Sequence, residues 1–213
     1  MSTAETTTIS QRMKDECWDL HQSAETATLP KLLLSGQISR EQYVAMLEQL
    51  YCVHKALDDA ITAHRPSLPA MADLIDDVQL MAPRIAQDLA HFGGTAEGVT
   101  AGPAASATID LIAARAAANP LSLIGLHYVR EGANNGNIFI ARKLQEAWKL
   151  DAIDGLSHLA PYGDQQRAMW GQFKTTLDGL DISAEDRDEI VTAGREMFQA
   201  IIDVNAEVAS IAD

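Results

Sequence analysis

The sequence predicts an all-α protein that folds as a single multi-helical domain. Alanine and leucine are abundant and aromatic residues make up only 5% of the chain, a composition that favours helices over sheets. Apolar residues recur every three or four positions in several long segments, and no segment alternates as a half-buried strand does. The 213 residues suffice for one good hydrophobic core. We expect a short flexible tail at residues 1–10 and one helical domain at residues 11–213.

Caps and breaks place the first helices. A helix is expected over residues 11–28 with Ser10 as its N-cap, followed by a restart at Pro30 and a stop at Gly36. The segment "SREQ" that begins at Ser39 has the spacing of a capping box, so a long amphipathic helix should follow it.

Similar signals order the rest of the chain. Prolines 66 and 69 end the long helix, and Asn119 with Pro120 begins a later one. The other expected elements are a helical segment over 70–92 that breaks at Pro83, a loop over 92–103, a helix over 104–117, a loop over 155–164, a helix over 165–179 and a last helix capped by Ser183 with Asp186.

Charge and cysteine content restrict the partners and the compartment. A net charge of −14 argues against nucleic acids and anionic membranes as partners. Cys17 and Cys52 lack disulfide or metal-site spacing, which is typical of reduced thiols in an intracellular protein. We see no leader sequence and no apolar run long enough to span a bilayer, so the expected location is cytoplasmic.

His21 and Glu25 form the first candidate site. At a spacing of i, i+4 they share one helix face. The carboxylate could then hydrogen-bond one ring nitrogen and leave the other free for a metal. The competing interpretation is a boundary histidine paired to a helix glutamate, and the spacing alone favours it.

The second candidate is the segment "LHYVREGANNGNIFIARKL" at residues 126–144. Gly132 and Gly136 lie one turn apart, and each glycine in a helix costs about 1 kcal/mol relative to alanine, so we expect an interruption here. Without a Cβ, the helix could pack tightly on another helix or lie directly against a flat ligand. Asn134 and Asn135 weaken the helix further and offer amides near such a ligand.

Scattered cations and histidines complete the candidates. Lys14 precedes His21 by two turns, and Arg167 and Lys174 lie two turns apart on a late helix. These cations could hold carboxylates near a pocket, although most such residues are simply solvated. The other histidines are expected at the core boundary or in loops: His54, His64, His91, His127 and His158.

Taken together, these segments resemble the heme oxygenase family, in its bacterial form. "HQSAETATLPKLLLSGQISREQYVAMLEQLYCVHKALDDAI" is similar to the family's N-terminal region, and "LHYVREGANNGNIFIARKL" to its distal helix. "RIAQDLAHFG" and the segment that begins "WGQFKTTLDGLDISAEDRDEIV" fit its middle and C-terminal helices. The similarity covers most of the chain in the right order.

The resemblance implies a fold, a reaction and a site. Heme would lie between a proximal helix that carries the iron ligand His21 and a distal helix kinked at the two glycines. With O2 and electrons from a donor such as ferredoxin or a flavin reductase, the enzyme would cleave heme to biliverdin, CO and ferrous iron. The residues expected at the reacting face are Gly132, Gly136, Asn134 and Asn135. Those expected to hold heme are His21, Lys14, Glu25, Tyr128, Ala133, Lys174 and Arg167, with the propionates on the two lysines.

Three positions depart from the family pattern. Ala133 stands where many members carry an aspartate that organises water, Asn137 replaces a glycine, and Trp18 replaces a basic residue. These departures leave open a non-enzymatic heme- or tetrapyrrole-binding protein on the same fold. A helical oxidase with two metals and a structural interaction module are the remaining alternatives.

Overall fold

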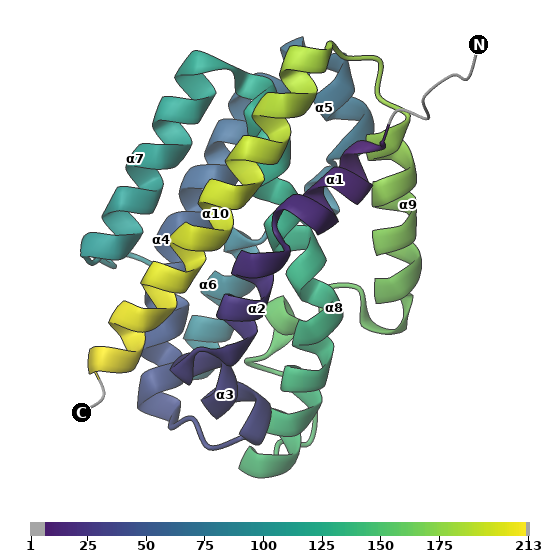
Figure 1. Ribbon diagram of the computed structural model, residues 1–213. Coiled ribbons are helices and arrows are strands. Elements are labelled where there is room, and N and C mark those ends of the chain that lie inside the picture. The colour runs from purple at the N-terminus through teal and green to yellow at the C-terminus, as the bar shows by residue number, and fades with distance from the viewer. Residues whose placement is uncertain (1–6, 212–213) are drawn as a thin grey trace.

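The computed structural model describes residues 7–211, and within them every long element is a helix (Figure 1). The α-helices are α1 Ile9–Glu16, α2 Trp18–Thr26, α3 Thr28–Ser35, α4 Arg40–His64, α5 Pro69–Leu74, α6 Ala82–His91, α7 Pro103–Ala118, α8 Leu123–Trp148, α9 Gln166–Asp178 and α10 Ala184–Ile211. Short 3-10 turns are η1 Arg65–Ser67, η2 Asp77–Gln79, η3 Pro120–Ser122, η4 Ser157–Leu159 and η5 Gly163–Gln165. The all-α fold predicted from the sequence is confirmed.

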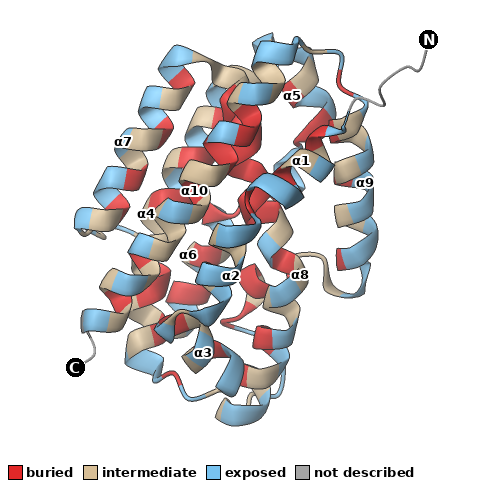
Figure 2. Cartoon of the chain, in the orientation of Figure 1, coloured by how far each residue is buried: buried red, intermediate tan, exposed pale blue. Residues whose placement is uncertain are grey.

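Helix α10 is the centre of the arrangement. It packs on α8, α7 and α4 and also on the three N-terminal helices α1, α2 and α3 (Figure 1). Buried residues line the inward faces of the long helices, whereas α2 has no buried residue at all (Figure 2). Helix α2 therefore packs on the outside of the bundle and contributes no buried residue to its core.

The backbones of α8 and α10 touch at a pair of glycines. A Cβ built on Gly125 would lie 1.9 Å from the carbonyl oxygen of Ile190, and one built on Gly194 would lie 2.2 Å from Cε of Met13. No side chain larger than hydrogen fits at either position without displacing its neighbour, and for Gly125 that neighbour is backbone. Gly125 and Gly194 thus set how closely the two helices approach.

The caps predicted at Ser39, Gly36 and Ser183 are present. Ser39 accepts a hydrogen bond from the Gln42 amide at 3.0 Å, and the Gln42 side chain accepts one from the Ser39 amide at 3.0 Å. Gly36 ends α3 with a left-handed φ of 72°. The Ser183 hydroxyl likewise accepts from the Asp186 amide at 3.0 Å at the start of α10.

The first helix differs from the prediction. It is two helices that break at Cys17, and α1 begins at Ile9, while residues 1–6 of the predicted tail lie outside the described residues. Its N-cap is Thr8, not Ser10. Ser10 donates instead to the Asp178 carboxylate at 2.6 Å, so a contact with α9 removes it from the capping role.

The segment over 70–92 breaks before Pro83 and not at it. Asp58 on α4 accepts hydrogen bonds from the backbone amides of Met81 and Ala82 at 2.8 and 2.7 Å, which fixes the start of α6. Pro83 lies in the first turn of α6, where its missing N–H has no partner to lose.

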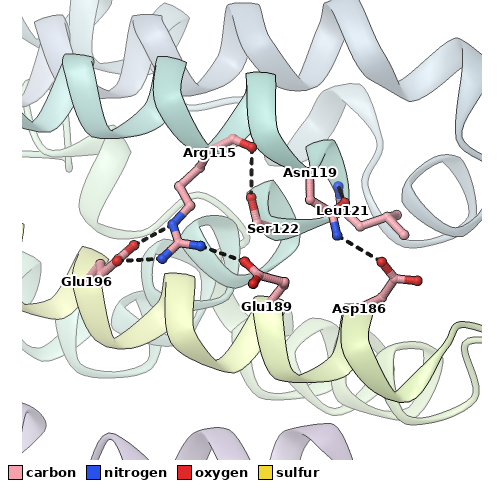
Figure 3. A network of polar contacts seen from close by, with 7 residues as sticks. All are labelled: Arg115, Asn119, Leu121, Ser122, Asp186, Glu189 and Glu196. Atoms are coloured by element: carbon pink, nitrogen blue, oxygen red, sulfur yellow. Dashed lines mark hydrogen bonds and ion pairs between the residues drawn. The ribbon is translucent and has the colours of Figure 1, made fainter.

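Ion pairs join α7 to α10 (Figure 3). Arg115 donates from Nη1 to Glu189 and from Nε to Glu196, both at 2.6 Å, and its side chain is largely buried. Asn119, predicted to cap the helix that contains residues 126–144, caps η3 directly before it, and its amide also donates to Asp186 at 2.8 Å. A charge network with one partly buried arginine contributes more than isolated surface pairs do.

Replacing Gly125 with alanine should reduce the free energy of unfolding by about 3 kcal/mol, because the added methyl group meets backbone that must move. The matched control is Gly171→Ala in α9, where a Cβ meets nothing within 4 Å. That control should stabilise the protein by about 0.5–1 kcal/mol. Urea unfolding of both variants checks the pair, and equal effects would contradict the close approach of α8 and α10.

Candidate functional site

His21 lies on the surface of α2 between two aromatic rings. Its imidazole stacks on Trp18 with ring centroids 5.7 Å apart, and it meets Phe198 of α10 edge-on at 5.8 Å. Nδ1 is shielded from solvent but has no hydrogen-bond partner, and Oε1 of Glu25 lies 3.7 Å away. That separation is too long for the predicted hydrogen bond. The ring is therefore held by stacking, and its Nδ1 has no hydrogen-bond partner among the described residues.

The surface around His21 is more apolar than a solvated helix requires. Trp18 is 51% exposed although it is large and aromatic, and α2 contributes nothing to the core (Figure 2). Trp18 thus presents an exposed aromatic ring directly beside His21. Burial raises the pKa of the neighbouring Cys17 thiol to about 11, so this cysteine stays protonated at neutral pH.

Gly136 leaves part of one face of α8 bare, whereas Gly132 is covered by a side chain of α9. A Cβ built on Gly136 would meet nothing within 4 Å, and one built on Gly132 would meet only the Trp170 ring, at 3.3 Å from Cη2. Phe139, one turn further along the helix, is 63% exposed. Close packing against Trp170 of α9 therefore accounts for Gly132, whereas no helix packing accounts for Gly136. Gly125 is the glycine of α8 that packs on another helix backbone.

The expected interruption of α8 is wrong, because the helix is continuous from Leu123 to Trp148. The amide of Asn135 donates back to the Gly132 carbonyl oxygen at 3.1 Å, and the buried Asn134 donates to Glu131 at 3.4 Å. Both asparagines are thus engaged within their own helix. Ala133 is exposed.

Trp170 of α9 joins several of the predicted residues. Its ring meets Tyr128 at 4.9 Å, lies beside Gly132 and carries the Lys174 ammonium 5.5 Å from its centroid. Sequence reasoning did not single out Trp170, because the contact depends on how α9 packs on α8.

Lys14 and Arg167 are not drawn into this group. Both side chains are exposed, Lys14 in the last turn of α1 and Arg167 near the start of α9. The break at Cys17 also separates Lys14 from the helix of His21, so the two do not share one helix face as the spacing suggested.

Behind α8 lies a buried polar network that the sequence did not indicate. Arg130 pairs with Asp58 of α4 and also donates to Nδ1 of His127. His54 and His127 lie in the interior and not at its boundary. Burial, together with the charge of Arg130, holds the pKa of both histidines well below the ordinary value, so both are neutral.

A second buried pair anchors the loop before α9. The Asp88 carboxylate accepts from the His158 amide and ring at 2.9 and 2.8 Å, and from the Ser157 amide and hydroxyl at 2.9 and 2.7 Å. Burial raises the pKa of Asp88, but these donors outweigh it and the net shift is downward. The loop is therefore fixed to α6.

The described residues contain neither a metal cluster nor a membrane-spanning helix. Across residues 7–211 no histidine, cysteine or carboxylate side chains gather in threes to hold a metal ion. Over the same range, no helix has the length and hydropathy needed to cross a bilayer.

Comparison with known proteins places these features in a family. The heme oxygenase family model matches residues 7–207. A heme oxygenase of Takifugu rubripes is 25% identical over 201 residues, which is 92% of this chain and 72% of that protein. Among solved structures, heme oxygenase-2 of Synechocystis sp. PCC 6803 in complex with heme and NO has a TM-score of 0.87 at 20% identity, covering 96% of this chain and 86% of that one. Heme oxygenase-1 of the same organism, in complex with heme, has a TM-score of 0.85 at 20% identity, with 96% and 94% covered.

Asp88→Asn should lower the free energy of unfolding by about 3 kcal/mol at neutral pH, because an amide cannot accept all four hydrogen bonds in a buried position. The depressed pKa makes this contribution fully present above about pH 4 and lost as the pH falls through the folded-state pKa. Urea unfolding at neutral and acidic pH checks this, with Asp110→Asn on the exposed face of α7 as the control. A difference that stays constant with pH would rule out the charge as its source.

Proposed function

The chain belongs to the heme oxygenase family, and on that premise we propose that it binds heme between α2 and α8 and cleaves it to biliverdin, CO and ferrous iron. The observation that carries the proposal is the bare face of α8 at Gly136, where a Cβ would meet nothing within 4 Å, combined with the stacked histidine of α2, whose Nδ1 has no partner. A flat macrocycle fits a helix face that lacks side chains.

His21 is the proposed iron ligand. Trp18 and Phe198 hold its ring in place, and Glu25 lies on the Nδ1 side, which leaves Nε2 for the iron. A neutral imidazole ligand, unlike a thiolate, does not push electrons toward O–O cleavage. That property suits an enzyme that directs oxidation to the ring.

The polar edge of heme is assigned to the cations near α9. Lys174 rests on the Trp170 ring, where an ammonium group is partly shielded from water and well placed for a propionate. Lys14 and Arg167 are exposed and can contribute as solvated charges. Tyr128 supports this edge by packing on Trp170.

Bound heme supplies both the iron that activates O2 and the ring that is oxidised. The protein's part is to hold the ring flat, exclude bulk above it at the two glycines and deliver protons. Electrons must come from a donor such as ferredoxin or a flavin reductase. Because the chain carries a net charge of −14, we propose that the donor approaches with a basic patch.

The competing function is heme or tetrapyrrole binding without turnover. Ala133 is exposed and carries no carboxylate, and the amides of Asn134 and Asn135 bond to their own helix and not toward a ligand. A binder that lacks groups for ordering water would form a stable complex with O2. The two functions therefore differ in the fate of the reduced complex and not in the binding itself.

His21→Ala should abolish the Soret band of a histidine-ligated heme complex when the protein is titrated with hemin, because the proposed iron ligand is lost. His64→Ala, at the end of α4 and on neither helix of the proposed site, is the matched control and should bind like the wild type. Reducing the wild-type complex in air should then produce the biliverdin spectrum. A stable oxy complex would favour the binder, and a Soret band that His21→Ala leaves unchanged would exclude His21 as the ligand.

Gly136→Ala should separate stability from function. Alanine in this open helical position should raise the free energy of unfolding by about 0.5–1 kcal/mol, while its methyl group enters the space assigned to heme. Hemin affinity and biliverdin formation should therefore fall as the melting temperature rises. Gly171→Ala, equally open but on α9, should give the same stabilisation with heme binding intact. Parallel losses in both variants would place the ligand elsewhere.

A further inference from the structure

The interface between α8 and the start of α9 contains buried polar atoms that no group of the described residues 7–211 satisfies. These are Oε1 of Glu131 and both amide atoms of Gln166. Glu131 is 0% exposed and Gln166 is 4% exposed. Buried polar atoms of this kind are normally paired with ordered water. Two such side chains in one interface therefore point to a water site.

Contacts on either side of Gln166 in the sequence reach Glu131 and Gly132 of α8. Four residues before it, the Tyr162 hydroxyl donates to Oε2 of Glu131 at 2.9 Å. Four residues after Gln166, Trp170 lies against Gly132, which directly follows Glu131 in α8. Gln166 falls between these two contacts and faces inward, because it shares the buried face of α9 with Phe173.

We propose that Glu131 and Gln166 hold an ordered water beside Gly132, and that Glu131 exchanges protons between this water and the Tyr162 hydroxyl. The inference rests on the proposed function and deepens it, since it identifies the group that supplies protons next to the bare face of α8. Glu131 is the proton-transferring residue, and Gln166 and Tyr162 are positioning residues.

The charges that face Glu131 suit a carboxyl group that gains and loses a proton. Burial raises its pKa above the ordinary value, and the charge of Asp76, before η2, acts in the same direction. The Tyr162 hydrogen bond and the charge of Arg130 oppose these effects without cancelling them. Burial also raises the pKa of Tyr162, so its hydroxyl keeps its proton at neutral pH.

The proposed proton transfer through Glu131 returns every group to its starting protonation state. The protonated carboxyl releases its proton from Oε1 to the water, which passes a proton on toward the heme face. The Tyr162 hydroxyl then passes its proton to Oε2 as it takes another from solvent in the same step, so no phenolate forms; Tyr162 is only partly buried. Rotation of the carboxyl group returns the proton to the side of the water and completes the cycle, and no oxidant or reductant is consumed.

This assignment resolves the departure at position 133. Ala133 is exposed, so a carboxylate there would be solvated, whereas the carboxyl group of Glu131 lies in the interior. A proton donor shielded from bulk water can be held at one atom and aimed. The chain then needs no acidic residue after the first glycine.

The heme-free protein provides the first test. Infrared difference spectra recorded across a pH titration should show a protonated carboxyl band that titrates above the range of ordinary glutamates and is absent in Glu131→Gln. Glu146→Gln, exposed on the same helix, should retain the band. Tyr162→Phe should shift the frequency of the band, because it removes one donor. A spectrum without such a band overturns the proposal whether or not the protein degrades heme.

The heme-loaded protein provides the second test. Glu131→Gln should bind hemin within about twofold of the wild type but form biliverdin at least tenfold more slowly, with an increased solvent isotope effect and a changed pH profile. Unchanged turnover in Glu131→Gln overturns the proton-transfer role while leaving the proposed function standing. Failure of the wild type to produce biliverdin overturns the proposed function instead, and the infrared band still decides whether Glu131 holds a proton.

Discussion

The contact between Gly125 of α8 and the backbone of α10 fixes the distance between the two longest helices, and the rest of the site is arranged around it. Met13 of α1 lies directly on Gly194, so the same crossing also sets where the N-terminal helices rest. The position of His21 on α2 relative to the bare face of α8 follows from these contacts. Gly125 and Gly194 in the core therefore set the spacing of the helices that carry the proposed site.

Local signals predicted the fold well, and long-range contacts account for its errors. The cap at Ser39 and the stop at Gly36 depend only on residues within one turn, so their spacing was sufficient. The start of α1 was misplaced because Ser10 bonds to Asp178 across 168 positions of sequence. The start of α6 depends on Asp58 in the same way. No linear pattern carries that information.

The same difference between local signals and long-range contacts explains which residues of the candidate site were predicted and which were missed. His21 with Glu25 and Gly132 with Gly136 are i, i+4 pairs, so each could be found on its own helix. Trp170 and the pairing of Glu131 with Tyr162 come from separate elements and were missed. One signal was present, because Gln166 occupies the first position of a helix face that Trp170, Phe173 and Leu177 continue on α9. A lone polar residue on such a face indicates a buried polar partner.

The placement of the tryptophans has an optical consequence. Trp18 stacks on the proposed iron ligand and Trp170 borders the bare glycine face, so two of the three indoles in the chain flank the proposed site. Trp148 packs instead against Tyr43 and Phe92. The near-ultraviolet emission of the protein is therefore weighted toward this one region. A pigment bound there would quench the fluorescence of Trp18 and Trp170, so the intrinsic fluorescence of the protein would report how much of the site is occupied.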